Sequence, residues 1–236
     1  MRRLLAFAVL ILCCGSLPAA EAPSAAATTP VSRLELPWWQ ARLAEKEAQA
    51  ATQHDTVLLG DSITHNWDAI APDLQKQYFG EVLNLGFSGD RTEHVLWRIA
   101  RIDWATVAPK RIMLMIGTNN AGCRRDSPDE IFGGIRAIVE HLRAACPEAK
   151  ITLLEIFPRN LNGADPRRQT NDAVNRRLPE LADEEHVYLR TVNPFYLMPD
   201  GDTLNTALLP DQLHPTKEGH RLWAAAVSRD FLRDYR

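Results

Sequence analysis

The chain has 236 residues, of which 45% are hydrophobic and 24% are charged. This balance is typical of a soluble globular protein and excludes extensive intrinsic disorder. The formal net charge of -3 leaves no excess of positive charge to hold a phosphate backbone or an anionic membrane surface. We therefore do not expect nucleic acid as a partner. No apolar stretch after the first 22 residues approaches membrane length, so we expect no stable membrane insertion once a signal peptide has been cleaved.

The first 22 residues have the pattern of a secretory signal peptide. Arg2 and Arg3 precede an apolar run from Leu4 to Leu12, which is too short to span a bilayer comfortably, and small residues follow. We expect cleavage after Ala20 or after Ala22. The pattern predicts a secreted or periplasmic protein.

A second segment, residues 23–36, is rich in Ala, Pro, Ser and Thr and has no period, so we predict a flexible leader. Order is expected to begin near Pro37, and residues 37–236 are predicted to form one domain. Pro37 suits the first position of a helix, which Trp38 and Trp39 would dock on that domain.

Two cysteines, Cys123 and Cys146, remain after the signal peptide. The helix predicted between them, from about Pro128 to Ala145, would hold its ends roughly 25 Å apart. We therefore predict no disulfide and interpret both thiols as small buried hydrophobes.

Five short and mostly apolar runs predict the strands of a parallel sheet that is covered on both faces. They are Thr56–Leu59, Val82–Leu85, Arg111–Ile116, Ile151–Ile156 and Val187–Thr191. Segments of helical period separate them, including about Arg167–Leu178 and, last, about Lys217–Leu232. The alternation predicts an α/β protein with a three-layer α/β/α sandwich and right-handed crossovers.

The helix after the third strand has both of its ends marked. Ser127 and Glu130 form a capping box, Pro128 takes the first helical position, and a proline follows the end. Gly133 and Gly134 lie inside this helix, and we interpret them as sites of close packing on the sheet.

Candidate catalytic residues follow the strands, where the loops of such a sandwich bind ligands. Ser62 stands on a tight turn directly after the first strand, a natural position for a nucleophile. His214 would take its proton, and Asp211, three residues earlier, would orient the imidazole. Each motif alone is more often an ordinary turn, but the two together predict a Ser-His-Asp triad.

Two further loops offer donors for the oxyanion of an acyl-transfer reaction. Gly89 follows the second strand and can present its backbone N–H, and Asn119 follows the third strand and carries an amide. The Ser62 N–H would be the third donor. Gly86 we interpret as a plain loop signal.

These four stretches in this order resemble the blocks of the SGNH hydrolases, the GDSL esterase/lipase family. The named Ser, Gly, Asn and His of that family fall on Ser62, Gly89, Asn119 and His214. The segments around Gly89 and Asn119, with Phe157-Pro158-Arg159 and two asparagines in the next helix, are most similar to platelet-activating factor acetylhydrolase catalytic subunits and their secreted bacterial relatives. The resemblance implies a flavodoxin-like SGNH fold over about residues 55–232.

Several other residues have two interpretations. His65 and Trp67 could line an acyl pocket, but packing is the commoner use of such side chains. Asp61 and Asp90 are expected to fix loop backbones. Arg159 could meet an anionic leaving group or pair locally.

The remaining charged candidates favour structural use. Arg91, His94 and Arg98 are interpreted as solvated or salt-bridged, not substrate-binding. His214 and His220 match no common zinc spacing, so we expect neither a metal nor another cofactor.

The expected function is therefore a secreted serine esterase that acts on a short acyl ester, most plausibly acetyl, of a carbohydrate or a small lipid-like alcohol. The preference for acetyl is implied by the resemblance. A lysophospholipase or thioesterase for longer chains, and a non-catalytic carbohydrate-binding module, are the alternatives. A homodimer is possible, since dimers occur among the resembling subunits.

Overall fold

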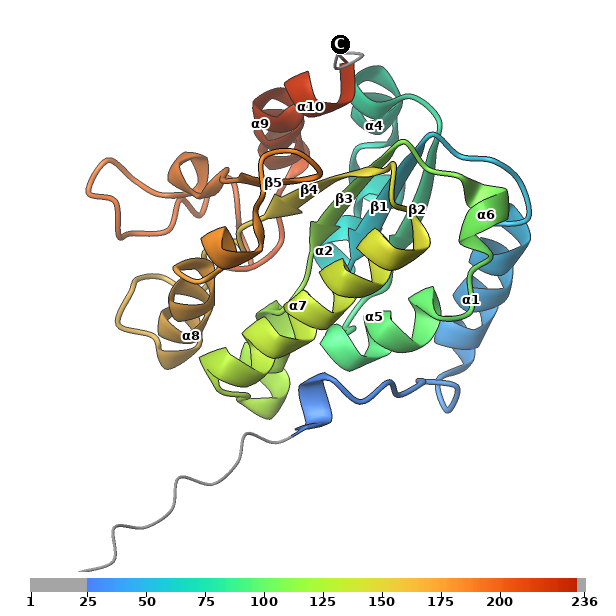
Figure 1. Cartoon of the computed structure of the whole chain (residues 1–236). Helices are drawn as coiled ribbons and strands as arrows, with labels where there is room; N and C mark the ends of the chain where they lie inside the picture. The colour runs from blue at the N-terminus through green and yellow to red at the C-terminus, as the bar shows by residue number, and fades with distance from the viewer. Residues whose placement is uncertain (1–24, 233–236) are drawn as a thin grey trace, which may run out of the picture.

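A five-stranded parallel sheet forms the centre of the molecule (Figure 1). We describe residues 25–232 of the computed structural model. The strands are β1 (Thr56–Gly60), β2 (Val82–Gly86), β3 (Arg111–Met115), β4 (Lys150–Leu154) and β5 (Val187–Arg190), in the order β2-β1-β3-β4-β5. This is the flavodoxin-like order, and it confirms the predicted fold class.

Helices cover both faces of this sheet because successive strand residues point to opposite sides. On one face, Val57 and Leu59 pack under α5 (Thr92–Ile99), α7 (Pro128–Ala145) and α8 (Pro166–Asn175). On the other face, Leu58 packs against residues of α2 (Ser62–His65), α3 (Trp67–Ile70), α4 (Pro72–Phe79) and α9 (Lys217–Val227). Figure 1 shows α7 running in front of the sheet with α5 beside it.

The remaining elements are short or lie at the edge of the sandwich. They are α1 (Pro37–Gln49), α6 (Trp104–Val107), α10 (Arg229–Leu232) and four single turns, η1 (Ala25–Ala27), η2 (Asn120–Arg124), η3 (Leu178–Leu181) and η4 (Asn193–Tyr196). The predicted last helix is divided at Ser228 into α9 and α10. In α1, Trp39 is buried as expected, whereas Trp38 remains 42% exposed.

The helix α7 has the predicted ends, and its cap is formed as the capping box requires. Ser127 N donates to Glu130 Oε2 at 2.7 Å, and Glu130 N donates back to Ser127 Oγ at 3.3 Å. The glycines of α7 were predicted to pack closely on the sheet, but the close contact is with other elements. A Cβ on Gly134 would lie 2.5 Å from Thr92 Oγ1 and 2.8 Å from Ala27 O, so Gly134 admits α5 and the N-terminal segment, not the sheet.

The prediction of a flexible leader is wrong for the part that the structure describes. Residues 25–36, here called the N-terminal segment, lie along α5 (Figure 1, blue). Ala27 is buried and its carbonyl accepts from Thr92 Oγ1 at 2.8 Å, while Val31 N donates to Glu93 O at 3.2 Å. Composition could not predict this docking because it depends on backbone groups. The predicted signal peptide, residues 1–22, lies outside the described part.

Both cysteines of the described residues are free. Cys146 is buried, as predicted, but Cys123 is exposed because it lies in the outward turn η2. Within residues 25–232, no helix is long and apolar enough to span a membrane.

The two adjacent glycines of α7 give a matched test of the packing at Gly134. Ala is favoured over Gly in a helix interior by up to about 1 kcal/mol, so Gly133→Ala, whose new Cβ would have no neighbour nearer than 3.7 Å, should be neutral or stabilising. Gly134→Ala should lower the free energy of unfolding by about 1–3 kcal/mol, because Thr92 and the Ala27 carbonyl must move. Urea unfolding measures both, and equal stabilities would contradict the packing described.

Candidate active site

The candidate residues gather at the carboxyl ends of the strands. Ser62 follows β1, Gly89 follows β2 and Asn119 follows β3. His214 lies in the long connection between β5 and α9. Because all five strands are parallel, these loops share one edge of the sheet.

A tight turn positions Ser62 as the first residue of α2. A Cβ on Gly60 would lie 2.4 Å from Met115 O, so only glycine fits there beside β3. Asp61 caps α2 by accepting from Ile63 N at 3.0 Å. At the end of β2, a Cβ on Gly86 would meet the backbone of α2 at 2.3 Å. Gly86 is therefore more than a loop signal, since it allows α2 to approach the sheet.

A chain of hydrogen bonds joins the predicted nucleophile, base and carboxylate. Ser62 Oγ lies 2.8 Å from His214 Nε2, and His214 Nδ1 lies 2.6 Å from Asp211 Oδ2. The other carboxylate oxygen, Asp211 Oδ1, accepts from the backbone N–H of Leu213 at 3.0 Å and of His214 at 2.7 Å. The turn passes through Gln212 with φ of 64°, which brings the carboxylate under the imidazole.

The protonation of Asp211 suits this arrangement. Partial burial alone would raise the pKa of the carboxyl, but the hydrogen bonds from the His214 backbone and ring hold the pKa below its usual value. Asp211 is therefore ionised at neutral pH, and an ionised carboxylate favours the His214 tautomer with its proton on Nδ1. Nε2 is then left to accept from Ser62.

The two predicted oxyanion donors are linked through one backbone carbonyl. Asn119 Nδ2 donates to Asp90 O at 2.9 Å, directly after Gly89. A primary amide carries two hydrogens, so this bond fixes the Asn119 side chain and leaves its second hydrogen for a ligand. Gly89 has φ of 75°, a conformation that favours glycine.

The carboxylate of Asp90 anchors the loop that contains Gly89, as predicted. It is fully buried and accepts from Trp39 Nε1 and from Arg98 Nε, both at 2.9 Å. Arg98 is also buried and donates to the carbonyls of Gly60 at 3.4 Å and Leu85 at 3.1 Å. Arg98 is thus salt-bridged, one of the two expected roles, and it joins β1, β2 and α5 beneath the site.

Next to the nucleophile, Asp61 is an unusual buried carboxyl. Its Oδ1 atom caps α2, and its Oδ2 atom is buried without a hydrogen-bond partner among the described residues. Burial raises its pKa to about 7, although the N–H of Ile63 and the nearby His214 act in the opposite direction. Asp61 fixes the loop backbone, as predicted. Because its pKa is raised, the presence of this carboxyl lowers the stability of the fold increasingly as pH rises towards 7.

The residues with two interpretations mostly prove to be structural. Trp67 is buried in the core against Trp223, and the edge of its ring meets His220. Ring nitrogen Nδ1 of His65 lies 2.9 Å from Ser88 Oγ, and burial lowers the pKa of this imidazole to about 4. His220 packs between aromatic rings, and no cluster of three metal-ligating side chains occurs in the described part of the chain.

The arginine after β4 pairs locally. Arg159 is buried, and its guanidinium donates to Thr118 O at 2.7 Å and to Thr118 Oγ1 at 3.1 Å. Asn175 holds the backbone of Ile156 through both of its amide atoms, at 2.8 Å each. These side chains shape the loops after β3 and β4.

Two side chains that hold the loops of the site were not predicted from the sequence. Asn120 donates to Asp126 Oδ2 at 2.9 Å and accepts from Thr92 N at 3.1 Å, so it holds the start of α5 beside Asn119. Its position directly after Asn119 was the one sequence feature that could have indicated this role. Arg33 of the N-terminal segment donates to Ser88 O at 2.9 Å and had no such signal.

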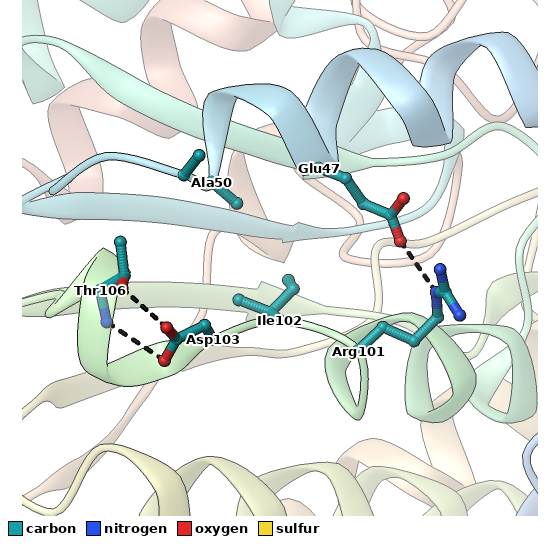
Figure 2. Close-up of a pocket in the computed structure, with 7 residues that line it drawn as sticks. Glu47, Ala50, Arg101, Ile102, Asp103 and Thr106 are labelled. Atoms are coloured by element: carbon teal, nitrogen blue, oxygen red, sulfur yellow. Dashed lines mark hydrogen bonds and ion pairs between the residues drawn. The ribbon is translucent and has the colours of Figure 1, made fainter.

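Two of the hollows in the described part of the chain lie near opposite ends of the strands. One of about 470 Å³ lies between the end of α1 and the α5–α6 connection, beside the ion pair of Glu47 and Arg101 at 2.8 Å (Figure 2). It adjoins the segments that precede β1 and β3, so it is remote from Ser62. The other, of about 300 Å³, lies between η2 and the start of α8 and is lined by Ala121, Arg125, Asp165, Pro166, Arg167 and Thr170.

The fold and the site define a parallel α/β protein with a hydroxyl, an imidazole and a carboxylate in hydrogen-bonded series. Comparison with known proteins gives the family. Residues 58–222 match the GDSL-like lipase/acylhydrolase family, and the chain belongs to it. It is a carboxylic ester hydrolase.

Relatives and solved structures agree with this assignment. The chain is 33% identical over 172 residues to human platelet-activating factor acetylhydrolase IB subunit alpha2, covering 70% of this chain and 71% of that protein. A GDSL-like lipase from Bacteroides thetaiotaomicron has the same fold, with a TM-score of 0.65, 22% identity, and 81% and 96% of the two chains covered. An acetylxylan esterase from Geobacillus stearothermophilus aligns with a TM-score of 0.60, 22% identity, and 78% and 97% covered.

The raised pKa of Asp61 predicts a pH-dependent stability. In the unfolded chain this carboxyl titrates near its ordinary value of about 3.9, so between pH 4 and pH 7 the unfolded state loses a proton that the folded state keeps. The free energy of unfolding therefore falls as pH rises. Asp61→Asn keeps an acceptor for Ile63 N and has no proton to lose. From pH 5 to pH 7 it should gain about 1–2 kcal/mol relative to wild type in urea unfolding; a constant difference would contradict a raised pKa.

Proposed function

We propose that the protein is a secreted or periplasmic serine esterase that removes short acyl groups, in particular acetyl, from a carbohydrate or a small lipid-like alcohol. The single observation that carries the proposal is the hydrogen-bonded series from Ser62 Oγ through the His214 ring to the Asp211 carboxylate, at 2.8 and 2.6 Å. Such a series is what an otherwise inert hydroxyl needs in order to attack a carbonyl.

In the proposed reaction, His214 Nε2 takes the proton of Ser62 as the oxygen attacks the ester carbonyl. The negative charge that develops on the carbonyl oxygen is stabilised by the N–H groups of Ser62 and Gly89 and by the second hydrogen of Asn119 Nδ2. His214 then returns the proton to the departing alcohol, while Asp211 stabilises the imidazolium. Water, deprotonated by the same imidazole, hydrolyses the acyl-enzyme and restores Ser62.

The choice of acetyl is supported by one observation. The similar acetylhydrolases and the acetylxylan esterase are named for the release of acetyl groups. A panel of esters decides between a carbohydrate and a small lipid-like alcohol.

Export rests on the sequence of the first 22 residues, with positive charges, a short apolar run and small residues in series. Outside the cytoplasm, acetylated polysaccharides and envelope lipids are accessible substrates. Expression of the whole chain with cell fractionation tests this part separately from the chemistry.

The direct test of the chemistry compares wild type with Ser62→Ala on acetylated sugars, acetylated glycerolipids and nitrophenyl esters from acetyl to octanoyl. Wild type should prefer acetyl, and Ser62→Ala should lose essentially all turnover, since no other group replaces its oxygen. Removal of this half-buried hydroxyl, which bonds only to the His214 ring among the described residues, should leave the melting temperature within about 1–2 °C of wild type.

Residual turnover in Ser62→Ala would exclude Ser62 as the nucleophile. A preference for octanoyl over acetyl would instead favour the lysophospholipase or thioesterase alternative. Sugar binding without turnover by wild type would favour a carbohydrate-binding module.

The oxyanion role of Asn119 has its own test. Asn119→Ala should lower kcat by about 10²–10³-fold, the usual loss for one oxyanion donor. Asn175→Ala is the matched control, because its amide contacts only the backbone of Ile156. The control should lose stability while keeping its kcat, and an unchanged kcat in Asn119→Ala would remove this residue from the site.

A further inference from the structure

The loop after β2 contains one peptide unit that the proposed mechanism depends on. In residues 87–90, here called the oxyanion loop, the proposed donor is the N–H of Gly89. This N–H belongs to the same planar peptide as the carbonyl of Ser88. In a trans peptide the two groups point in opposite directions, so whatever fixes Ser88 O also fixes the direction of Gly89 N–H.

The group that fixes Ser88 O is Arg33, which comes 55 residues earlier in the chain. Arg33 Nη1 donates to Ser88 O at 2.9 Å and lies 3.3 Å from Asp90 Oδ1. Its side chain is only 20% exposed, and Nη1 lies 3.0 Å from the position of a Cβ on Gly89. The guanidinium therefore lies directly against this peptide and links Ser88 to Asp90 within the oxyanion loop.

Contacts on both sides hold Arg33 in place. Towards the N-terminus, Val31 N donates to Glu93 O at 3.2 Å. Towards the C-terminus, Leu36 N donates to Arg33 O at 3.0 Å, immediately before α1 begins. From α1, Trp39 Nε1 then donates to the same Asp90 oxygen that Arg33 approaches. The N-terminal segment is thus attached to the oxyanion loop at two points, the carbonyl of Ser88 and the carboxylate of Asp90.

The charges favour a role beyond attachment. Asp90 already has a buried cation in Arg98, at 2.9 Å, so Arg33 adds a second positive charge to a single carboxylate. A cation that donates to a carbonyl draws electron density from the amide and strengthens its N–H as a donor. An oxyanion hole gains most from donors that are oriented before the negative charge develops.

We propose that Arg33 is a positioning residue of the oxyanion hole, which orients and polarises the Ser88–Gly89 peptide so that the Gly89 N–H stabilises the tetrahedral intermediate. This inference rests on the proposed function for its consequence in catalysis. It makes the N-terminal segment part of the active site.

The test replaces Arg33 by Met, which keeps the length of the apolar stem without the guanidinium, and by Lys, which keeps the charge and a donor. Arg136→Met is the matched control, since Arg136 forms only an exposed pair with Glu140 at 3.8 Å on α7 and lies over the Phe132 ring. With active sites titrated by a nitrophenyl ester, Arg33→Met should lower kcat about 10-fold and leave KM nearly unchanged, and Arg33→Lys should recover part of the loss. The control should keep both constants.

A merely structural role would have a different result. It would lower the melting temperature and the fraction of titratable sites, while kcat per active site stayed at the wild-type value. That result, or a loss confined to KM, overturns the inference.

A second measurement needs no substrate. The amide signal of Gly89 in a ¹H–¹⁵N spectrum of the free protein reports on the same peptide, and it should shift in Arg33→Met and remain in place in Arg136→Met. An unmoved Gly89 signal overturns the inference whether or not the protein hydrolyses esters. Failure of wild type to hydrolyse any ester would overturn the proposed function instead, and the two failures are thereby distinguished.

Discussion

The hydrogen bond between Ser62 and His214 depends on bringing together two residues that are 152 positions apart in the chain. A parallel sheet achieves this because every strand ends at the same edge. β1 lies between β2 and β3 and delivers Ser62 to that edge, and the connection after β5 returns to it with His214. The close approach of backbone at Gly60 and Gly86 lets α2 sit directly on the strand ends.

Beneath this edge, two buried charged side chains hold the loops in place. The Asp90 carboxylate and the Arg98 guanidinium are both buried, and burying charged groups is costly unless each is paired and hydrogen-bonded. Here the carboxylate has the indole N–H of Trp39 and two arginines, and Arg98 has two strand-end carbonyls. These hydrogen bonds offset the cost of removing the two charges from water. They also hold the loop after β2 rigid, where the proposed mechanism requires oriented donors.

Much of this architecture could be predicted from the sequence. The strands were predictable to within two residues because they are short and apolar on both faces, and α7 was predicted with its observed bounds because a capping box and a proline mark its start. Ser62, Asp211 and His214 were predictable as a group because each lies in a loop expected at the same edge. The structure brings these three together.

The N-terminal segment could not be predicted in this way. Its docking uses the carbonyl of Ala27, the N–H of Val31 and one arginine, none of which produces a hydrophobic period. The same holds for Gly134, whose partner, Thr92, lies in another helix. Cys123 was predicted to be buried from residue type alone, and the outward turn η2 overrides that preference. Contacts of this kind are set by tertiary structure and leave no local pattern.

In the proposed mechanism, Ser62 carries the acyl group during turnover. The most direct measurement is rapid acid quenching of the protein during hydrolysis of nitrophenyl acetate, followed by proteolysis and mass spectrometry of the peptides. We expect an acetyl-sized increase in mass on the peptide that contains Ser62, formed within the burst phase. An acetyl group found on another residue, or turnover with no acylated peptide at any time, would contradict it.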